Sequence, residues 1–177
     1  MFNIFGFYKF KKLNNLKKLK NRLENNLKDY EIRGTIIISP EGVNGTISDK
    51  KNNLLKFNKL LKKILSIKKF NSENNSNSKF NPFHKLKIKI KKEVVPMGFK
   101  VRNYNFPKNN LNPREWNKII KKKDTVLIDA RKSFEYDVGT FKKSLNPNIE
   151  NFREFPKYLN QFKTSENIAM FCTGGIR

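Results

Sequence analysis

The sequence predicts two domains, an α+β domain followed by a smaller α/β domain. Residues 1–95 contain two amphipathic helical patterns separated by short β-branched or alternating runs, which is typical of a sheet covered by helices. Residues 114–177 instead alternate short apolar runs with short helical patterns, which indicates a parallel sheet. Residues 96–113 contain Pro107 and several asparagines, and we expect them to form a linker.

The first half of the α+β domain is expected to begin with a strand, a helix and a hairpin. Residues 2–10 are rich in aromatic side chains and predict a strand. Residues 32–39 form a β-branched run, Pro40-Glu41-Gly42 predicts a turn, and residues 43–48 predict the returning strand. Between the first two strands, leucines spaced by three and four residues predict an amphipathic helix, namely Leu13, Leu16, Leu19, Leu23 and Leu27.

A second helix and a last strand complete the pattern. The helix is predicted at residues 51–65, and residues 71–81 are polar, rich in Asn and Ser, and expected to form a loop. Residues 84–94 alternate apolar residues with lysines, which predicts a half-exposed strand. The order β-α-β-β-α-β is that of the ferredoxin-like fold. We expect four strands, two helices on one face, and the other face open to a partner.

The second domain places two polar residues at the ends of strands. Residues 125–128 and 168–171 are predicted to be buried strands, followed by Asp129 and by Cys172. Sites in parallel sheets lie at the carboxyl ends of the strands, so these two residues mark a candidate site. Helices or helical turns are predicted at residues 113–120, 134–140 and 152–162.

The charge of the chain indicates a polyanionic partner. The 177 residues include 39 Lys and Arg against 15 Asp and Glu, a formal net charge of +24. Such a charge is typical of proteins that bind nucleic acid. It is equally explained by coding bias, because Lys and Asn are both abundant here and rise together in AT-rich genomes. In either case the positive field speeds association with RNA at low salt.

The composition excludes several other classes of protein. One Cys cannot form an internal disulfide, and with one His it cannot form a Cys/His metal cluster. No apolar run approaches the roughly 18 to 20 residues of a membrane span. Residues 1–8 lack the basic region and small-residue cleavage site of a signal peptide. We therefore expect a reduced thiol and a cytoplasmic protein.

The strongest functional signal is the loop that begins at Cys172. The loop continues as Thr173, Gly174, Gly175, Ile176 and Arg177. Glycines let the loop amides turn toward one point, and the arginine adds positive charge, so both features favour the nucleophilic thiolate. The alternative is a buried cysteine that acts as a small hydrophobe. We favour a functional thiol because Cys172 follows the strand rather than lying inside it.

Two further groups of charged residues each have a functional and a structural interpretation. Asp129, Arg131 and Glu135 either brace the loop that carries the thiolate or form a surface ion-pair cluster worth about 0–1 kcal/mol. The second group either contacts phosphates, which fixes register without reading sequence, or is a solvated strand face. That group consists of Lys85, Lys87, Lys89 and Lys91.

Several separated motifs resemble those of the bacterial rhodanese-containing tRNA uridine(34) hydroxylases. Members of that family have a ferredoxin-like N-terminal domain before the rhodanese domain, in the order read above. The motifs are Gly34-Thr35-Ile36-Ile37-Ile38, Glu41-Gly42-Val43-Asn44-Gly45-Thr46, Lys92-Glu93-Val94-Val95, Gly139-Thr140-Phe141-Lys142 and Cys172-Thr173-Gly174-Gly175-Ile176-Arg177.

The resemblance implies an activity. It implies oxygen-dependent hydroxylation of the wobble uridine of tRNA to 5-hydroxyuridine, with tRNA as partner and molecular oxygen as co-substrate. It implies that Cys172 is the catalytic residue and a persulfide carrier, and that the loop amides from Thr173 to Arg177 stabilise the sulfur anion. No metal or organic cofactor is implied.

The chain also departs from the family pattern. In the family a second cysteine, a helix, a strand and another helix follow the loop arginine. We therefore expect a truncated copy with an incomplete rhodanese-like domain over residues 114–177, poorly folded beyond Thr125 and inactive on its own. Two alternatives stay open, a sulfurtransferase that carries a persulfide on Cys172 and a non-catalytic basic RNA-binding fragment. The N-terminal domain favours the hydroxylase, since a sulfur carrier has no evident need for it.

Overall fold

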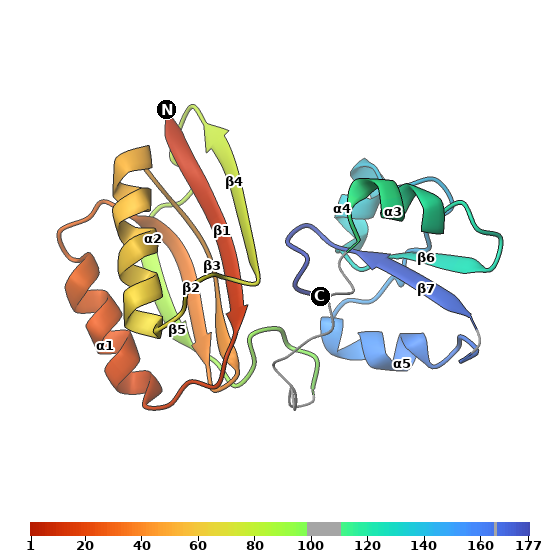
Figure 1. Cartoon of the computed structure of the whole chain (residues 1–177), viewed down its shortest axis with the longest axis horizontal. Coiled ribbons are helices and arrows are strands. Elements are labelled where there is room, and N and C mark those ends of the chain that lie inside the picture. Colours follow the sequence, from red (N-terminus) through yellow and green to blue (C-terminus); the bar gives the residue numbers. More distant parts are fainter. Residues whose placement is uncertain (99–110, 165) are drawn as a thin grey trace. The chain divides into compact units, whose positions relative to one another are not determined.

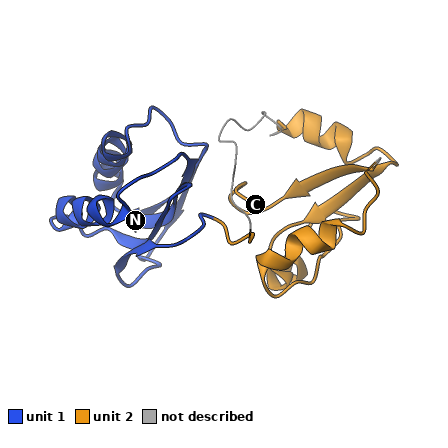
Figure 2. Ribbon diagram, turned by 90° about the horizontal axis from the view of Figure 1, so that it is seen from below, with its two compact units in different colours: residues 1–94 blue, residues 95–177 orange. Residues whose placement is uncertain are grey.

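The computed structural model describes residues 1–98, 111–164 and 166–177. These residues divide into two units, Met1–Val94 and Val95–Arg177, which Figure 2 draws in blue and orange. Residues 99–110, most of the predicted linker, lie outside the described residues.

Unit 1 is a five-stranded sheet with two helices on one face (Figure 1). The strand order is β4-β1-β3-β2-β5; neighbours among the first four strands are antiparallel, and β5 adds to the edge parallel to β2. The predicted ferredoxin-like order of elements is confirmed. The elements are β1 (Phe2–Phe10), α1 (Leu16–Leu27), β2 (Arg33–Ser39), β3 (Gly42–Asp49), α2 (Lys51–Leu65), β4 (Ser72–Ser78) and β5 (Leu86–Ile90).

The predicted loop at residues 71–81 is wrong, because Ser72–Ser78 forms strand β4. This strand is the fourth of the ferredoxin-like order, and it pairs with β1 along its whole length. It lies at an edge of the sheet and its side chains are largely exposed, so backbone hydrogen bonds hold it without an apolar pattern. The alternating segment after residue 84 is therefore a fifth strand, where we expected the fourth.

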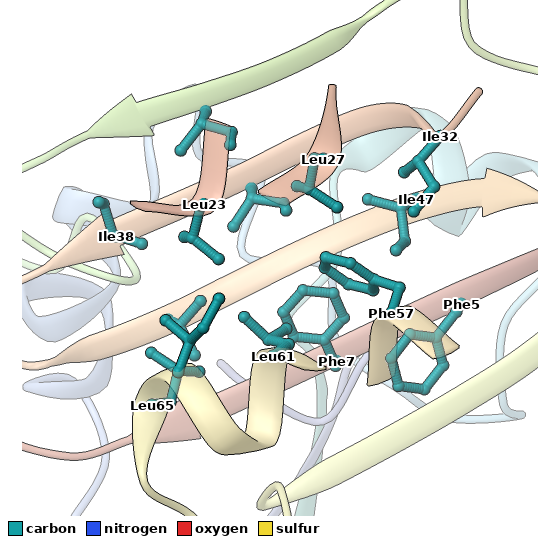
Figure 3. Packing of buried hydrophobic residues seen from close by; sticks show 14 of the residues in the cluster. Phe5, Phe7, Leu23, Leu27, Ile32, Ile38, Ile47, Phe57, Leu61 and Leu65 are labelled. Atoms are coloured by element: carbon teal, nitrogen blue, oxygen red, sulfur yellow. The ribbon is translucent and has the colours of Figure 1, made fainter. Parts of the chain in front are cut away.

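The core of unit 1 lies between the sheet and the two helices (Figure 3). The rings of Phe5 and Phe7 stack at a centroid distance of 5.2 Å, and Phe7 also contacts Phe57 and Phe70. Gly45 on β3 makes room for this cluster, because a Cβ atom there would lie 2.6 Å from Cζ of Phe7. The aromatic run of β1 is thus the surface on which the helices pack.

Unit 2 is built on a pair of parallel strands, β6 (Thr125–Asp129) and β7 (Asn167–Phe171). The predicted strands of the second domain are confirmed, whereas the predicted helix at 152–162 is a 3₁₀ turn followed by a shorter helix. The other elements are α3 (Pro113–Ile119), α4 (Ser133–Val138), η1 (Phe152–Glu154) and α5 (Phe155–Leu159). Within the described part of the chain, no helix has the length and apolar character needed to cross a membrane.

The two units differ in the size of their buried hydrophobic clusters. Among the described residues of unit 2, the cluster has three buried members, Ile128, Ala130 and Phe155. The cluster of unit 1 has sixteen. Buried apolar area is the main favourable term in folding, so unit 2 is the less stable unit.

Unit 2 is therefore expected to unfold first on heating. Trp116, the chain's one tryptophan, lies in unit 2 and packs against Phe141 and Phe171, so its fluorescence reports on that unit. We expect the fluorescence midpoint to precede the midpoint of far-UV circular dichroism by about 5 °C or more, since about 1 kcal/mol shifts the midpoint of a small domain by that amount. Coincident transitions would contradict this prediction.

Candidate active site

The parallel pairing of β6 and β7 brings the two predicted site segments together. Asp129 is in register with Phe171, the last residue of β7. The backbone N–H of Ala130 then donates to the carbonyl of Phe171 at 2.9 Å. The chain therefore leaves both strands at the same edge, with Arg131 on one exit and Cys172 on the other.

The loop after β7 bends back toward the sulfur atom of Cys172. Cys172 is half-buried and packs against the small core of unit 2. The backbone N–H of Gly175 donates to Sγ of Cys172 at 3.1 Å. Gly175 has φ +68°, a left-handed conformation that glycine adopts without strain. Glycine at this position thus lets a loop amide face the thiol.

The remaining hydrogen-bonding side chains of the loop hold it to the rest of unit 2. Thr173 donates from Oγ1 to Oε1 of Glu135 at 2.7 Å, which ties the loop to α4. Arg177 donates from Nη1 to the carbonyl of Ala130 at 3.0 Å, and its guanidinium lies 5.6 Å from the ring centroid of Phe152. The guanidinium of Arg177, which we expected near the sulfur, is thus hydrogen-bonded to the residue that follows β6.

Asp129 is the buried centre of the other exit. Its carboxylate accepts hydrogen bonds from the backbone N–H of Arg131 at 3.0 Å, from Nη2 of Arg131 at 2.6 Å and from Oγ1 of Thr140 at 2.8 Å. Arg131 also donates to the carbonyl of Gly139 at 2.7 Å. Because Asp129 is 1% exposed, this cluster is an internal brace between the β6 exit and the Gly139–Thr140 turn, and not a surface ion pair.

The two carboxylates of the site are held in the ionised state. Burial raises the pKa of Asp129, but hydrogen bonds from Arg131 and Thr140 outweigh burial and hold that pKa below its ordinary value. Burial also raises the pKa of Glu135, and there hydrogen bonds from Thr173 and the Lys132 backbone, with the charges of Arg177 and Arg131, lower it overall. Neither group is a proton donor at neutral pH.

An open cavity of about 430 Å³ lies beside the thiol. Phe141 is 44% exposed, and its ring meets that of Phe171 edge-on at 4.9 Å between centroids. Sequence reasoning missed this aromatic wall, although Phe141 lies in the Gly139-Thr140-Phe141 motif and Phe171 directly precedes Cys172. The cavity is lined by Arg131, Glu135, Gly139, Thr140, Phe141, Phe171, Cys172 and Thr173. No group of three or more potential metal-ligating side chains occurs among the residues that the structure describes.

Replacing Asp129 by Asn tests the brace through its pH dependence. The pKa of Asp129 is depressed in the folded protein, so its ionised form stabilises the fold above the ordinary value of 3.8. This stabilisation is lost as the pH falls through the folded-state pKa. We expect Asp129→Asn to lower the free energy of unfolding of unit 2 by about 1–3 kcal/mol at pH 7, and the difference to shrink toward pH 3.

The measurement is denaturant unfolding followed by Trp116 fluorescence between pH 3 and pH 7. Asp137→Asn is the matched control, because Asp137 is an exposed carboxylate on α4. Its effect should stay within about 0.5 kcal/mol. A difference for Asp129→Asn that does not change with pH would overturn the account.

Known proteins resemble the chain in sequence over nearly its whole length. A family model described as the UPF0176 acylphosphatase-like domain matches residues 2–94. A tRNA uridine(34) hydroxylase of Pelagibacter ubique is 61% identical over 177 residues, which are 100% of this chain and 59% of that protein. Proteins of the same name from Legionella pneumophila and Prochlorococcus marinus are 39% and 43% identical, over 98% and 90% of this chain and 70% and 54% of theirs.

The chain thus spans a little over half the length of several of the relatives that it matches. Among solved structures, Klebsiella pneumoniae BlrP1 covers 51% of the chain at 16% identity with a TM-score of 0.37, a similarity too low to support any inference.

Proposed function

The chain belongs to the tRNA uridine(34) hydroxylase family, and on this premise we propose that the protein converts uridine 34 of tRNA, the wobble position, to 5-hydroxyuridine. The observation that carries the proposal is the thiol of Cys172 beside an open cavity at the carboxyl ends of two parallel strands. A volume of about 430 Å³ accommodates a single nucleoside. Such an enzyme acts on a base that has left its stack, which suits the unpaired anticodon loop.

In this proposal Cys172 is the catalytic residue. The Gly175 N–H supports negative charge on sulfur, whether the group is a thiolate or a persulfide. The exposed ring of Phe141 offers a surface for stacking of the uracil base next to that sulfur. Asp129, Arg131 and Glu135 hold the surrounding loops and keep the cavity in shape.

The reaction replaces the C5–H bond of uracil by C5–OH, a two-electron oxidation. We propose molecular oxygen as the co-substrate, as in a monooxygenase, and no metal or organic cofactor. One oxygen atom enters the new C5–OH group, and the other leaves as water after it takes two electrons and two protons from an external two-electron reductant. We also propose that residues 114–177 are part of a rhodanese-like domain, since a loop that starts with cysteine follows a strand of a parallel sheet. We propose a cytoplasmic protein, since bacterial tRNA is in the cytoplasm.

Genetic complementation with Cys172→Ser tests the proposal. A bacterial strain deleted for its own tRNA uridine(34) hydroxylase receives the intact gene that contains this coding sequence, and tRNA nucleosides are quantified by mass spectrometry. We expect 5-hydroxyuridine to return, and the Cys172→Ser variant to give at least about 100-fold less, as for loss of a catalytic nucleophile. Lys56→Gln on α2, an exposed change in unit 1, serves as the control with normal levels.

Two outcomes would contradict the proposal. No 5-hydroxyuridine with the unaltered gene would reject the activity, and full restoration by Cys172→Ser would reject the role of the thiol.

A sulfurtransferase is the second candidate, because the same hydrogen bond from Gly175 to Sγ also suits a persulfide. In that case incubation with thiosulfate transfers its sulfane sulfur atom to the Cys172 thiolate as a persulfide and releases sulfite, and 5-hydroxyuridine levels do not depend on the gene. A basic RNA-binding protein without catalysis is the third candidate, given the net charge of +24. It would bind tRNA equally well after Cys172→Ser.

A further inference from the structure

The strand register of unit 1 aligns five residues across the whole sheet. Thr35 on β2 is opposite Lys87 on β5 and opposite Thr46 on β3. Thr46 is opposite Gly6 on β1, which is opposite Asn74 on β4. We call these five residues the cross-strand row.

The cross-strand row lies on the face that the helices do not cover. Side chains alternate between the two faces along a strand. Ile36 and Ile88 belong to the buried core cluster that also contains residues of α1 and α2, so their neighbours Thr35 and Lys87 point to the opposite face. Thr46 is exposed although β3 is the central strand, so no described residue of unit 1 covers its side chain.

The row has the dimensions and the chemistry of a binding track. Neighbouring strands lie about 4.8 Å apart, so the row is about 19 Å long, enough for several nucleotides of an extended strand. The two threonine hydroxyls and the amide of Asn74, which also donates to Ser72 at 3.3 Å, can donate to phosphate oxygens. Gly6, between Asn74 and Thr46, has no side chain to raise the surface there, which lets a ligand approach the backbone closely.

Positive charge surrounds one end of the row. Lys87 belongs to the row, Lys89 follows two residues later on the same face of β5, and Arg33 precedes Thr35 by two residues on β2. All three side chains are exposed, and the ion pairs formed among the described residues do not involve them. The row itself contains no carboxylate. This distribution favours a polyanion.

We propose that the cross-strand row, together with Arg33 and Lys89, binds the sugar-phosphate backbone of single-stranded RNA. The assignment of that RNA to the anticodon loop of a tRNA substrate rests on the proposed function; the binding surface itself does not. The surface belongs wholly to unit 1, whereas the thiol loop belongs to unit 2.

Lysines on an edge strand also have a purely structural use, since they prevent pairing with another sheet. That use explains Lys87 and Lys89 on the edge strand. It does not involve Thr46, because Thr46 lies on the central strand. Thr46 therefore separates the two explanations.

The test measures binding of the full chain to a fluorescent, unstructured RNA oligonucleotide of about ten nucleotides. We expect Thr46→Glu to weaken RNA binding about tenfold with no change in the unfolding of unit 1. Lysine is similar in size to glutamate but opposite in charge, so we expect Thr46→Lys to strengthen RNA binding. Lys87→Gln with Lys89→Gln should reduce the slope of log K against log salt by about 1.4, at about 0.7 per phosphate contact on a single strand.

The matched control is Lys56→Gln with Lys59→Gln, which removes the same charge from exposed positions on α2. We expect it to change affinity less than about twofold, as for exposed charges distant from the ligand. Equal losses for the two double variants would assign binding to net charge alone and overturn the proposal. Unchanged binding by Thr46→Glu, weaker binding by Thr46→Lys, or equal affinity for duplex RNA would also overturn it.

The binding surface and the proposed activity can fail separately. Normal RNA binding by Thr46→Glu, with 5-hydroxyuridine still dependent on Cys172, would reject the surface and leave the activity standing. RNA binding that is weakened by Thr46→Glu, with no 5-hydroxyuridine from the unaltered gene, would support the surface and reject the activity.

Discussion

The hydrogen-bonded pairing of β6 with β7 brings together the two segments on which the candidate active site is built. Two parallel strands in register must end at the same edge, so residues about forty positions apart in sequence, Arg131 and Cys172, leave the sheet together. A bridge between Ile128 and Leu145 on the other side of β6 then places Ser144 and the turn before it at that edge. The site therefore depends on backbone geometry first and on side chains second.

The buried carboxylate of Asp129 holds together the turns that line the open cavity. A buried charge is costly unless it is paired and hydrogen-bonded. Here Arg131, Thr140 and the Arg131 backbone satisfy it, and Arg131 reaches on to the Gly139 carbonyl. The hydrogen bonds that compensate the Asp129 charge thus also position the Gly139 turn and Phe141. These residues line the cavity beside the Cys172 sulfur atom.

The sequence predicted those parts of the structure that short-range patterns determine. Leucine spacing located α1, and the apolar run before Cys172 located β7, because burial imposes a period on each element. It did not predict β4, since a strand held at an edge by backbone hydrogen bonds leaves no hydrophobic period in Ser72–Ser78. Nor could it show that Thr140 reaches Asp129 or that Gly175 faces the thiol, because these contacts depend on how distant turns meet.

Gly45 and Thr46 are adjacent on the central strand but differ sharply in their freedom to vary. Even the methyl group of alanine at position 45 would collide with the ring of Phe7, which packs among three other phenylalanines, so the interior of the domain closes that position to substitution. Position 46 projects into solvent from the same strand. Packing therefore leaves it free to change, and whatever limits its variation during evolution comes from outside the fold.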